Sequence, residues 1–213
     1  MNRLKVSYTN TDFEISDFEN KVWRETEETN LHLYWSGAAA EIERHAKGRL
    51  VWTEEALFVW FTGNQSEPLI VNDEPNTTKK TINLWERDCF EIFIAPGAKT
   101  PETYFEFEAA PTGEWLDLKL KILPNGERET DFGYDSEMKV SAEIWDNKVF
   151  AMMKINWQAF GKKPRNGDVW RGNLFRCVGV GENRGYLAWQ STKTATPNFH
   201  VPDKFGYFEF VKN

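Results

Sequence analysis

Three glutamates could do acid–base chemistry, because Glu91, Glu106 and Glu108 lie in two consecutive runs of alternating apolar and polar residues. On neighbouring strands their carboxylates could stand about 5–9 Å apart, as glycoside hydrolysis requires. Nothing in the sequence supplies an apolar pocket that would raise the pKa of one of them, which an acid catalyst needs. The pattern therefore favours an exposed sheet face on which Lys119 and Lys121 of the next run offset the acids.

Tryptophan is the second candidate, since the chain has 10 Trp, 16 Phe and 6 Tyr in 213 residues. Trp85 precedes an alternating run, and Trp189 precedes a polar segment. An exposed indole beside polar groups can stack on the apolar face of a sugar ring; alternatively, each ring closes one end of the hydrophobic core. For Trp115, which adjoins a turn, the core alternative is favoured. Both interpretations stay open for Trp85 and Trp189.

Other motifs of catalysis or cofactor binding are missing from the sequence. Residues 179–181 (Gly-Val-Gly) lack the third glycine and the following helix of a dinucleotide fingerprint. The three histidines have no metal-ligand spacing, and there is no Gly-x-Ser-x-Gly motif. Cys89 and Cys177 are too few for a disulfide framework, and both lie in apolar runs, which predicts two free, buried thiols.

Short strands must position these residues. Apolar and polar residues alternate over 88–94, 104–109 and 115–122, with turn residues between the runs, which predicts an antiparallel meander. We expect Phe105 and Phe107 to face the core together with the leucines of the third run, and the opposite face of the sheet to be exposed.

The rest of the chain indicates one all-β domain over residues 1–213. Hairpins are predicted at 49–61 and 138–155, whereas irregular or loop structure is predicted for 1–20, 63–80 and 127–136. About ten short strands without a long helix are typical of an antiparallel, immunoglobulin-like β-sandwich.

Charge and hydropathy exclude several classes of partner. The net charge is −7 without a Lys/Arg cluster, which argues against binding nucleic acid or anionic lipid. The longest apolar run, 56–61, is too short to span a membrane. No secretory signal is visible in residues 1–20, so we expect a cytoplasmic protein, or an extracellular or periplasmic one if a leader was removed. Nothing in the sequence indicates an oligomeric state.

Several motifs occur in the order found in a known family. They lie at residues 49–52 and 56–59, 84–93, 104–108, 113–117 and 198–206. This set resembles the family 9 carbohydrate-binding modules of the wider DOMON-like group, from about Trp23 to Phe210. The resemblance implies a non-catalytic β-sandwich in which two tryptophans clamp a sugar, often at the reducing end of a plant polysaccharide. It also implies structural calcium in some members.

The resemblance also implies the roles of individual residues. The first clamp tryptophan, the hydroxyl-binding acid, the second clamp tryptophan and a polar contact correspond to Trp85, Glu91, Trp189 and Arg176. Where sugar-binding members carry an Arg and, two residues later, an Asn, this chain has Glu108 and Ala110. The change from a cation to an anion at the ligand-binding position 108 alters which sugar hydroxyls can pair there. A fully extended 85–91 segment would span about 20 Å, so a one-sugar site requires Trp85 to fold back in the preceding loop.

Two alternatives come from other functional classes. A DOMON-type haem-binding or electron-transfer domain would need axial ligands such as His200 with Met138, Met152 or Met153, although Met152 and Met153 are also core candidates. The second alternative is a sandwich that has lost its ligand site and serves only contacts with another protein.

Overall fold

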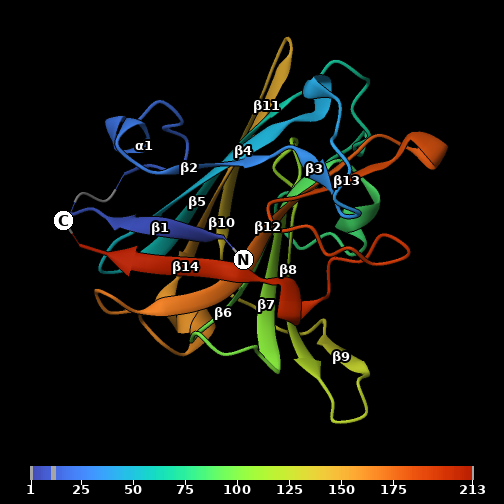
Figure 1. Cartoon of the computed structure of the whole chain (residues 1–213). Coiled ribbons are helices and arrows are strands. Elements are labelled where there is room, and N and C mark those ends of the chain that lie inside the picture. The colour runs from blue at the N-terminus through green and yellow to red at the C-terminus, as the bar shows by residue number, and fades with distance from the viewer. Residues whose placement is uncertain (1, 11–12, 213) are drawn as a thin grey trace.

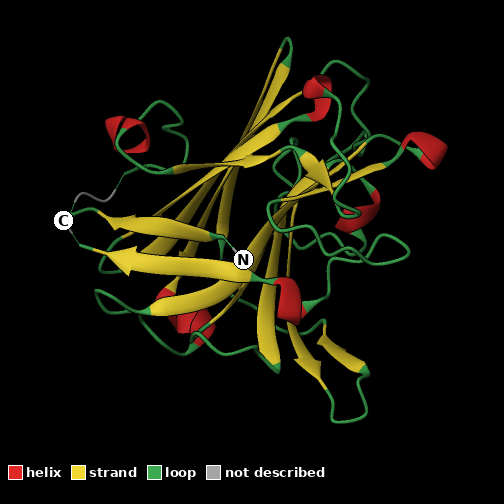
Figure 2. Cartoon of the chain, in the orientation of Figure 1, coloured by secondary structure: helices red, strands yellow, loops and turns green. Residues whose placement is uncertain are grey.

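The computed structural model describes residues 2–10 and 13–212 and consists mainly of strands (Figures 1 and 2). Among these residues the only α-helix is α1 (Lys21–Arg24), whose first turn is capped by the Asn20 side chain. The 3-10 turns are η1 (Ile42–Arg44), η2 (Leu84–Glu86), η3 (Trp157–Phe160), η4 (Gly181–Asn183) and η5 (Pro202–Lys204). The predicted all-β class is confirmed.

The described strands belong to a single hydrogen-bonded sheet. Its main path runs β10-β11-β5-β4-β1-β14-β12-β6-β7-β8-β9, while β2 pairs with β4 and β13 joins β12 to β3. In chain order the strands are β1 (Arg3–Tyr8), β2 (Glu28–Leu31), β3 (Leu33–Tyr34), β4 (Ala46–Trp52), β5 (Ala56–Asn64), β6 (Cys89–Ala95), β7 (Thr103–Ala109), β8 (Trp115–Ile122), β9 (Arg128–Asp131), β10 (Lys139–Trp145), β11 (Lys148–Asn156), β12 (Val169–Val178), β13 (Gly185–Ala188) and β14 (Gly206–Val211).

The sheet is mixed and curled, which corrects the predicted antiparallel sandwich. Strand β1 lies parallel to β14 on one side and to β4 on the other, and Figure 1 shows β1 and β14 side by side. The prediction of irregular structure for residues 1–20 is therefore wrong for β1. The local signal for this strand is weak, because only Leu4 and Val6 alternate as buried residues and the pairing partners are far away in the chain. Through β1 the two halves of the sheet become one hydrogen-bonded surface that curls around the core.

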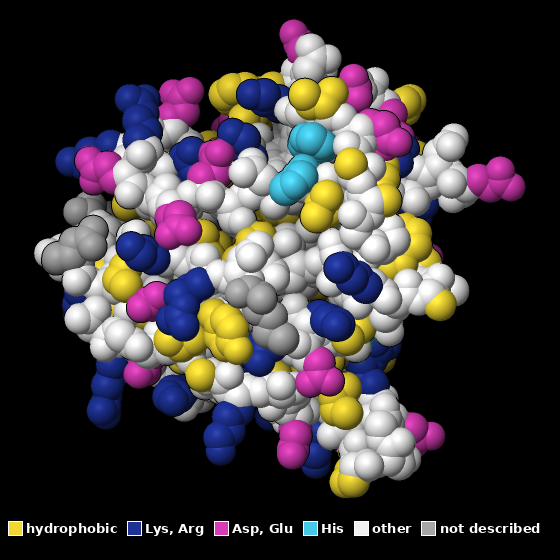
Figure 3. All heavy atoms as spheres, viewed as in Figure 1, with side chains coloured by type: hydrophobic (Ala, Val, Ile, Leu, Met, Phe, Trp, Pro, Cys, Tyr) yellow, Lys and Arg dark blue, Asp and Glu magenta, His cyan; other side chains and the backbone are white. Residues whose placement is uncertain are grey.

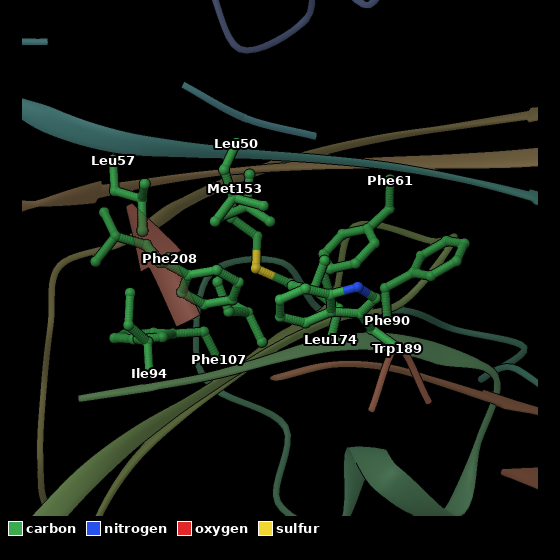
Figure 4. Close-up of a cluster of buried hydrophobic side chains, with 14 of the residues drawn as sticks. Leu50, Leu57, Phe61, Phe90, Ile94, Phe107, Met153, Leu174, Trp189 and Phe208 are labelled. Atoms are coloured by element: carbon green, nitrogen blue, oxygen red, sulfur yellow. The ribbon is translucent and has the colours of Figure 1, made fainter. Parts of the chain in front are cut away.

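The main hydrophobic core lies between the two halves of the sheet. Phe61 of β5 stacks on Phe90 of β6 with ring centroids 5.0 Å apart, so the contact joins one half to the other (Figure 4). Ile92 and Ile94 of β6 belong to the same cluster. The predicted alternation of β6, with its even-numbered residues facing the core, is therefore confirmed.

A second hydrophobic cluster covers the opposite face of β6, β7 and β8. Phe199 and Phe205, from the segment between β13 and β14, pack on this face, and Phe199 stacks on Phe175 of β12 with ring centroids 3.9 Å apart. The prediction that the leucines of β8 face the main core is wrong. The register pairs Leu118 with Glu106, so the leucines lie on the same face as the glutamates. This face is enclosed, not solvent-exposed.

Other predicted elements are confirmed, with one omission. The two hairpins are β4–β5 and β10–β11, and the polar segment before η2 contains no strand. Strand β9 forms where a loop was expected, because its pairing with β8 depends on that neighbour. No helix among the described residues is long and apolar enough to cross a membrane. On the face shown in Figure 3, Lys and Arg side chains are interspersed with Asp and Glu.

Candidate functional site

A pocket of about 340 Å³ lies over the second hydrophobic cluster. Strands β6 to β9, β12 and β13 supply its floor and walls, and η2 and segment 197–200 close its sides. Its lining residues are Trp85, Glu91, Glu106, Leu118, Leu120, Arg128, Thr130, Phe132, Cys177, Tyr186, Pro197, Asn198, Phe199 and His200. The pocket thus combines aromatic rings with carboxyl, amide, guanidinium and imidazole groups.

The η2 turn brings Trp85 to the pocket. Asn83 has φ = +62°, a left-handed conformation that Asn tolerates better than most residues, and it reverses the chain before Leu84 is buried in the second cluster. Arg184 then donates one hydrogen bond to the carbonyl oxygen of Trp85 at 2.6 Å. Trp85 therefore folds back and lines the same pocket as Glu91, as a one-sugar site requires.

Tyr186 is the second large aromatic side chain of the pocket. It lies on β13 directly opposite Cys177 of β12, and its ring makes edge contacts with Trp35 and Phe199. The Arg184 guanidinium lies 5.4 Å from its ring centroid. Tyr186 is not part of any motif recognised in the sequence; its position in a short strand after a Gly-rich turn is the only local signal.

Trp189 lies in the main core and does not form a clamp with Trp85, which corrects the predicted pairing. Its indole is 7% exposed and stacks on Phe208 with centroids 5.5 Å apart and planes 9° from parallel (Figure 4). A side chain at Gly206 would meet this ring, since a Cβ there would lie 2.6 Å from an indole carbon. The reason is strand alternation: Leu187 and Trp189 face the main core, whereas Tyr186 and Ala188 face the second cluster.

Arg176 is also buried away from the pocket, on the face of β12 that carries the main core. It donates hydrogen bonds to Gln65 Oε1 at 2.6 Å and to the carbonyl oxygens of Arg44 and His45 at 2.9 and 3.3 Å. Burial lowers the pKa of Arg176 to about 10. Its role is therefore to hold the start of β4 and the long loop after β5, not to contact a ligand as predicted.

The three glutamates lie together at the floor of the pocket. One carboxylate oxygen from each of Glu91, Glu106 and Glu108 lies within 4.8 Å of the other two. Burial raises the pKa of all three carboxyl groups, that of Glu106 to about 7. Glu91 and Glu106 line the pocket, whereas Glu108 lies beneath it and is fully buried. The predicted charge balance with Lys119 is wrong, because Lys119 pairs with Phe105 and lies on the other face.

Polar residues to which the sequence assigned no role in sugar binding also lie at the pocket. The Tyr104 hydroxyl lies 2.9 Å from His200 Nδ1, and burial, with a further contribution from the positive charge of Arg128, lowers the pKa of His200 to about 3. His200 is therefore neutral at physiological pH. Asn198 precedes it and accepts a hydrogen bond from its backbone N–H. Arg128 and Thr130 come from β9, the strand that was predicted as a loop.

Comparison with known proteins identifies the family. The family model described as carbohydrate family 9 binding domain-like matches residues 17–213, nearly the whole chain. The chain belongs to this family. A comparison with curated protein sequences gives no match.

Solved structures share the fold of this family 9 domain. A protein from Bacteroides uniformis that is proposed to bind carbohydrate aligns with a TM-score of 0.74 and 17% identity over 98% of both chains. A family 9 carbohydrate-binding module from Caldicellulosiruptor kristjanssonii has been solved with cellotriose and with glucose. Those two structures have TM-scores of 0.61 and 0.63 and identities of 18% and 17%; they match 100% of this chain and 95% and 97% of their own.

Haem binding finds no support in the geometry of this family 9 domain. His200 lies at the pocket, whereas Met138 and Met153 are buried in the main core and Met152 in a third cluster around Trp60. The proposed axial ligands therefore lie on different faces of the sheet.

Calcium does not fit the two groups of possible metal ligands found among the described residues. One group contains the sulfurs of Cys89 and Cys177 with Glu91, and the other is the glutamate cluster, Glu91, Glu106 and Glu108. Calcium takes six to eight oxygen ligands, whereas the glutamate cluster shares its space with the two thiols and with apolar side chains. A calcium site elsewhere in the domain stays a prediction of the family resemblance.

Proposed function

We propose that this domain binds a saccharide non-covalently in the pocket lined by Trp85 and Tyr186. The observation that carries the proposal is the composition of this pocket: two half-buried aromatic rings and several polar side chains around about 340 Å³. This volume lies at the lower end of the range for small-molecule sites. Membership of family 9 supports the proposal, and so do the related modules solved with cellotriose and with glucose.

The pocket offers both kinds of contact that a sugar needs. The C–H face of a pyranose ring stacks on an aromatic ring, which supplies contact area that water does not replace. Asn198, Arg128 and Thr130 offer donors and acceptors to the hydroxyl groups. Burial raises the pKa of Glu91 and so favours its protonated carboxyl form, which can both donate and accept a hydrogen bond.

The buried acids of the pocket favour binding without catalysis. A retaining glycosidase needs one protonated acid and one ionised nucleophile about 5–5.5 Å apart. Glu91 and Glu106 are close enough, but burial raises the pKa of both, and no ion pair with a Lys or Arg among the described residues holds either in the ionised form. The charge of Arg128 only partly offsets the burial of Glu106, so neither carboxyl group is held fully ionised at neutral pH as a nucleophile would be.

Calorimetric titration with glucose and with cellotriose tests the proposal. We expect millimolar or tighter binding by the parent, and a loss of at least about 2 kcal/mol in Trp85→Ala and in Tyr186→Ala, as for central anchors of an interface. Trp115→Ala is the matched control, because Trp115 is partly buried but lies outside the pocket. Chromatography of cellotriose after long incubation should show no shorter sugars.

Two outcomes would overturn parts of this proposal. No sugar binding by a folded parent would show that the domain has kept the fold and lost the site, leaving contacts with other proteins as its role. Release of glucose from cellotriose by the parent, abolished in Glu91→Gln, would make the domain a hydrolase.

A further inference from the structure

The floor of the pocket brings two thiols and two carboxylates together on one face of the sheet. Cys89 of β6 and Cys177 of β12 are paired directly across the two antiparallel strands. Glu91 follows Cys89 by two residues and so lies on the same face, and Glu108 of β7 is paired directly opposite Glu91. Residues paired in this way have Cβ atoms about 4.5–5.5 Å apart. The four side chains therefore lie next to one another on this face of the sheet, and those of Cys89, Glu91 and Cys177 bring their ligand atoms within 4.8 Å of one another.

The distances within this group suit a small tetrahedral ion. Glu91 Oε1 lies 3.2 Å from Cys177 Sγ and 3.6 Å from Cys89 Sγ, and Glu108 Oε2 lies 3.9 Å from Cys89 Sγ. Ligand atoms around zinc, bound at about 2.3 Å to sulfur and 2.0–2.2 Å to oxygen in a tetrahedron, are roughly 3.5–3.8 Å apart. The ligand atoms of Cys89, Glu91 and Cys177 all lie within 4.8 Å of one another and so come near this geometry, whereas Glu108 would reach the fourth position by a rotation of its side chain.

A second observation points to a missing partner. Oε1 of Glu108 is fully buried and has no hydrogen-bond partner among the described residues, and the same is true of Oε2 of Glu106. Buried polar atoms are nearly always satisfied in native proteins, by protein groups, water or an ion. In the described part of the chain, no Lys or Arg forms an ion pair with Glu91 or Glu108. Buried acceptors without a cation are what an absent cation would leave.

We propose that Cys89, Cys177, Glu91 and Glu108 bind one divalent transition-metal ion of the zinc type at the floor of the pocket. A ligand set of two sulfur and two oxygen atoms favours a four-coordinate, tetrahedral zinc ion. Calcium and magnesium take a larger number of ligands, all of them oxygen atoms. Cys177 and Glu91 line the pocket, so the ion has a path from solvent. The proposal stands independently of saccharide binding.

Cobalt(II) titration of the reduced, metal-free protein tests the site in the absence of sugar. We expect one equivalent to produce a sulfur-to-cobalt charge-transfer band together with the intense visible bands of tetrahedral cobalt, and one equivalent of zinc to remove them. Calcium should not compete. A titration without the charge-transfer band would overturn the proposal, and this result does not depend on any variant folding.

Variants assign the ligands. Cys89→Ser, Cys177→Ser and Glu108→Gln should each weaken zinc binding by more than about 100-fold, since loss of an outer-shell partner alone costs about 10–100-fold. Glu129→Gln, on exposed β9, is the control and should bind as the parent does. Undiminished binding by Cys89→Ser and Cys177→Ser would contradict the proposal.

Surface histidines need their own control. The rings of His32 and His45 have centroids 6.0 Å apart and could hold a metal ion adventitiously. We expect His32→Ala to leave both the stoichiometry and the charge-transfer band unchanged. If His32→Ala abolishes the bound equivalent, the metal was on the surface and the proposed site does not exist.

Discussion

Replacing Glu106 by Gln should stabilise the domain at alkaline pH and leave it nearly unchanged at pH 5. Burial raises the pKa of Glu106 from 4.5 to about 7, and a hydrogen bond with Glu108 and the nearby charge of Arg128 only partly oppose this. Because the pKa of Glu106 is higher in the folded state than in the unfolded state, the parent keeps its full stability below about pH 4.5. It loses part of this stability as the pH rises through about 7, where the buried carboxyl group must ionise. The difference corresponds to roughly 3 kcal/mol at about 1.4 kcal/mol per tenfold change. Glutamine keeps the shape of the protonated acid and never ionises.

Thermal and urea unfolding at pH 5 and pH 8.5, with a chelator present, measure this effect. We expect the melting temperature of Glu106→Gln to exceed that of the parent by roughly 6–12 °C at pH 8.5, since about 1 kcal/mol shifts a domain of this size by about 2–4 °C. His200, whose low pKa acts in the opposite direction below about pH 6.5, is present in both proteins and cancels in the comparison. Glu129→Gln should behave as the parent at both pH values. If the stabilities of the parent and of Glu106→Gln change in parallel with pH, the pKa of the Glu106 carboxyl group is not raised by burial.

Three further substitutions test the packing, each by urea unfolding. Trp189→Ala should cost about 3–5 kcal/mol, as for other large core deletions, whereas Trp85→Ala at the half-exposed pocket wall should cost far less; equal losses would contradict the two placements. Arg176→Leu should destabilise by at least about 3 kcal/mol, because Gln65 and two backbone carbonyls lose a charged donor, and a neutral result would argue against this network. Gly206→Ala should cost about 1–3 kcal/mol through collision with the Trp189 ring, and Trp189→Ala in the same chain should relieve most of it.

The sequence predicts the local elements of the fold better than their assembly. Period-two alternation and turn residues locate the hairpins and the orientation of β6, because these depend on residues close together in the chain. Strand β1 escapes prediction, since its partners are β14, some 200 residues away, and β4. The leucines of β8 illustrate a different limit: alternation shows that they share a face but does not show which face, and here both faces are buried.

The candidate site was predictable in part for the same reason. Trp85 and Glu91 are close in sequence, and the family pattern places both at one pocket, as the structure does. Trp189 is three residues after Tyr186, and the direction of its side chain depends on Phe208 and Gly206 of the last strand. Residue type alone could not decide which of these two aromatic residues reaches the pocket.

The two faces of the central strands have opposite effects on stability. The face of β6 with Phe90 packs only apolar groups across the main core, and its burial stabilises the fold. The pocket face buries Glu91, Glu106 and Glu108 beside two thiols, and burying such groups without partners destabilises the fold. Protons, a metal ion or sugar hydroxyls can each supply the missing partners. The unfolding experiments at two pH values with a chelator vary only the protons, the cobalt titration varies only the metal ion, and the sugar titration varies only the sugar. Together they determine which of these partners the pocket face binds.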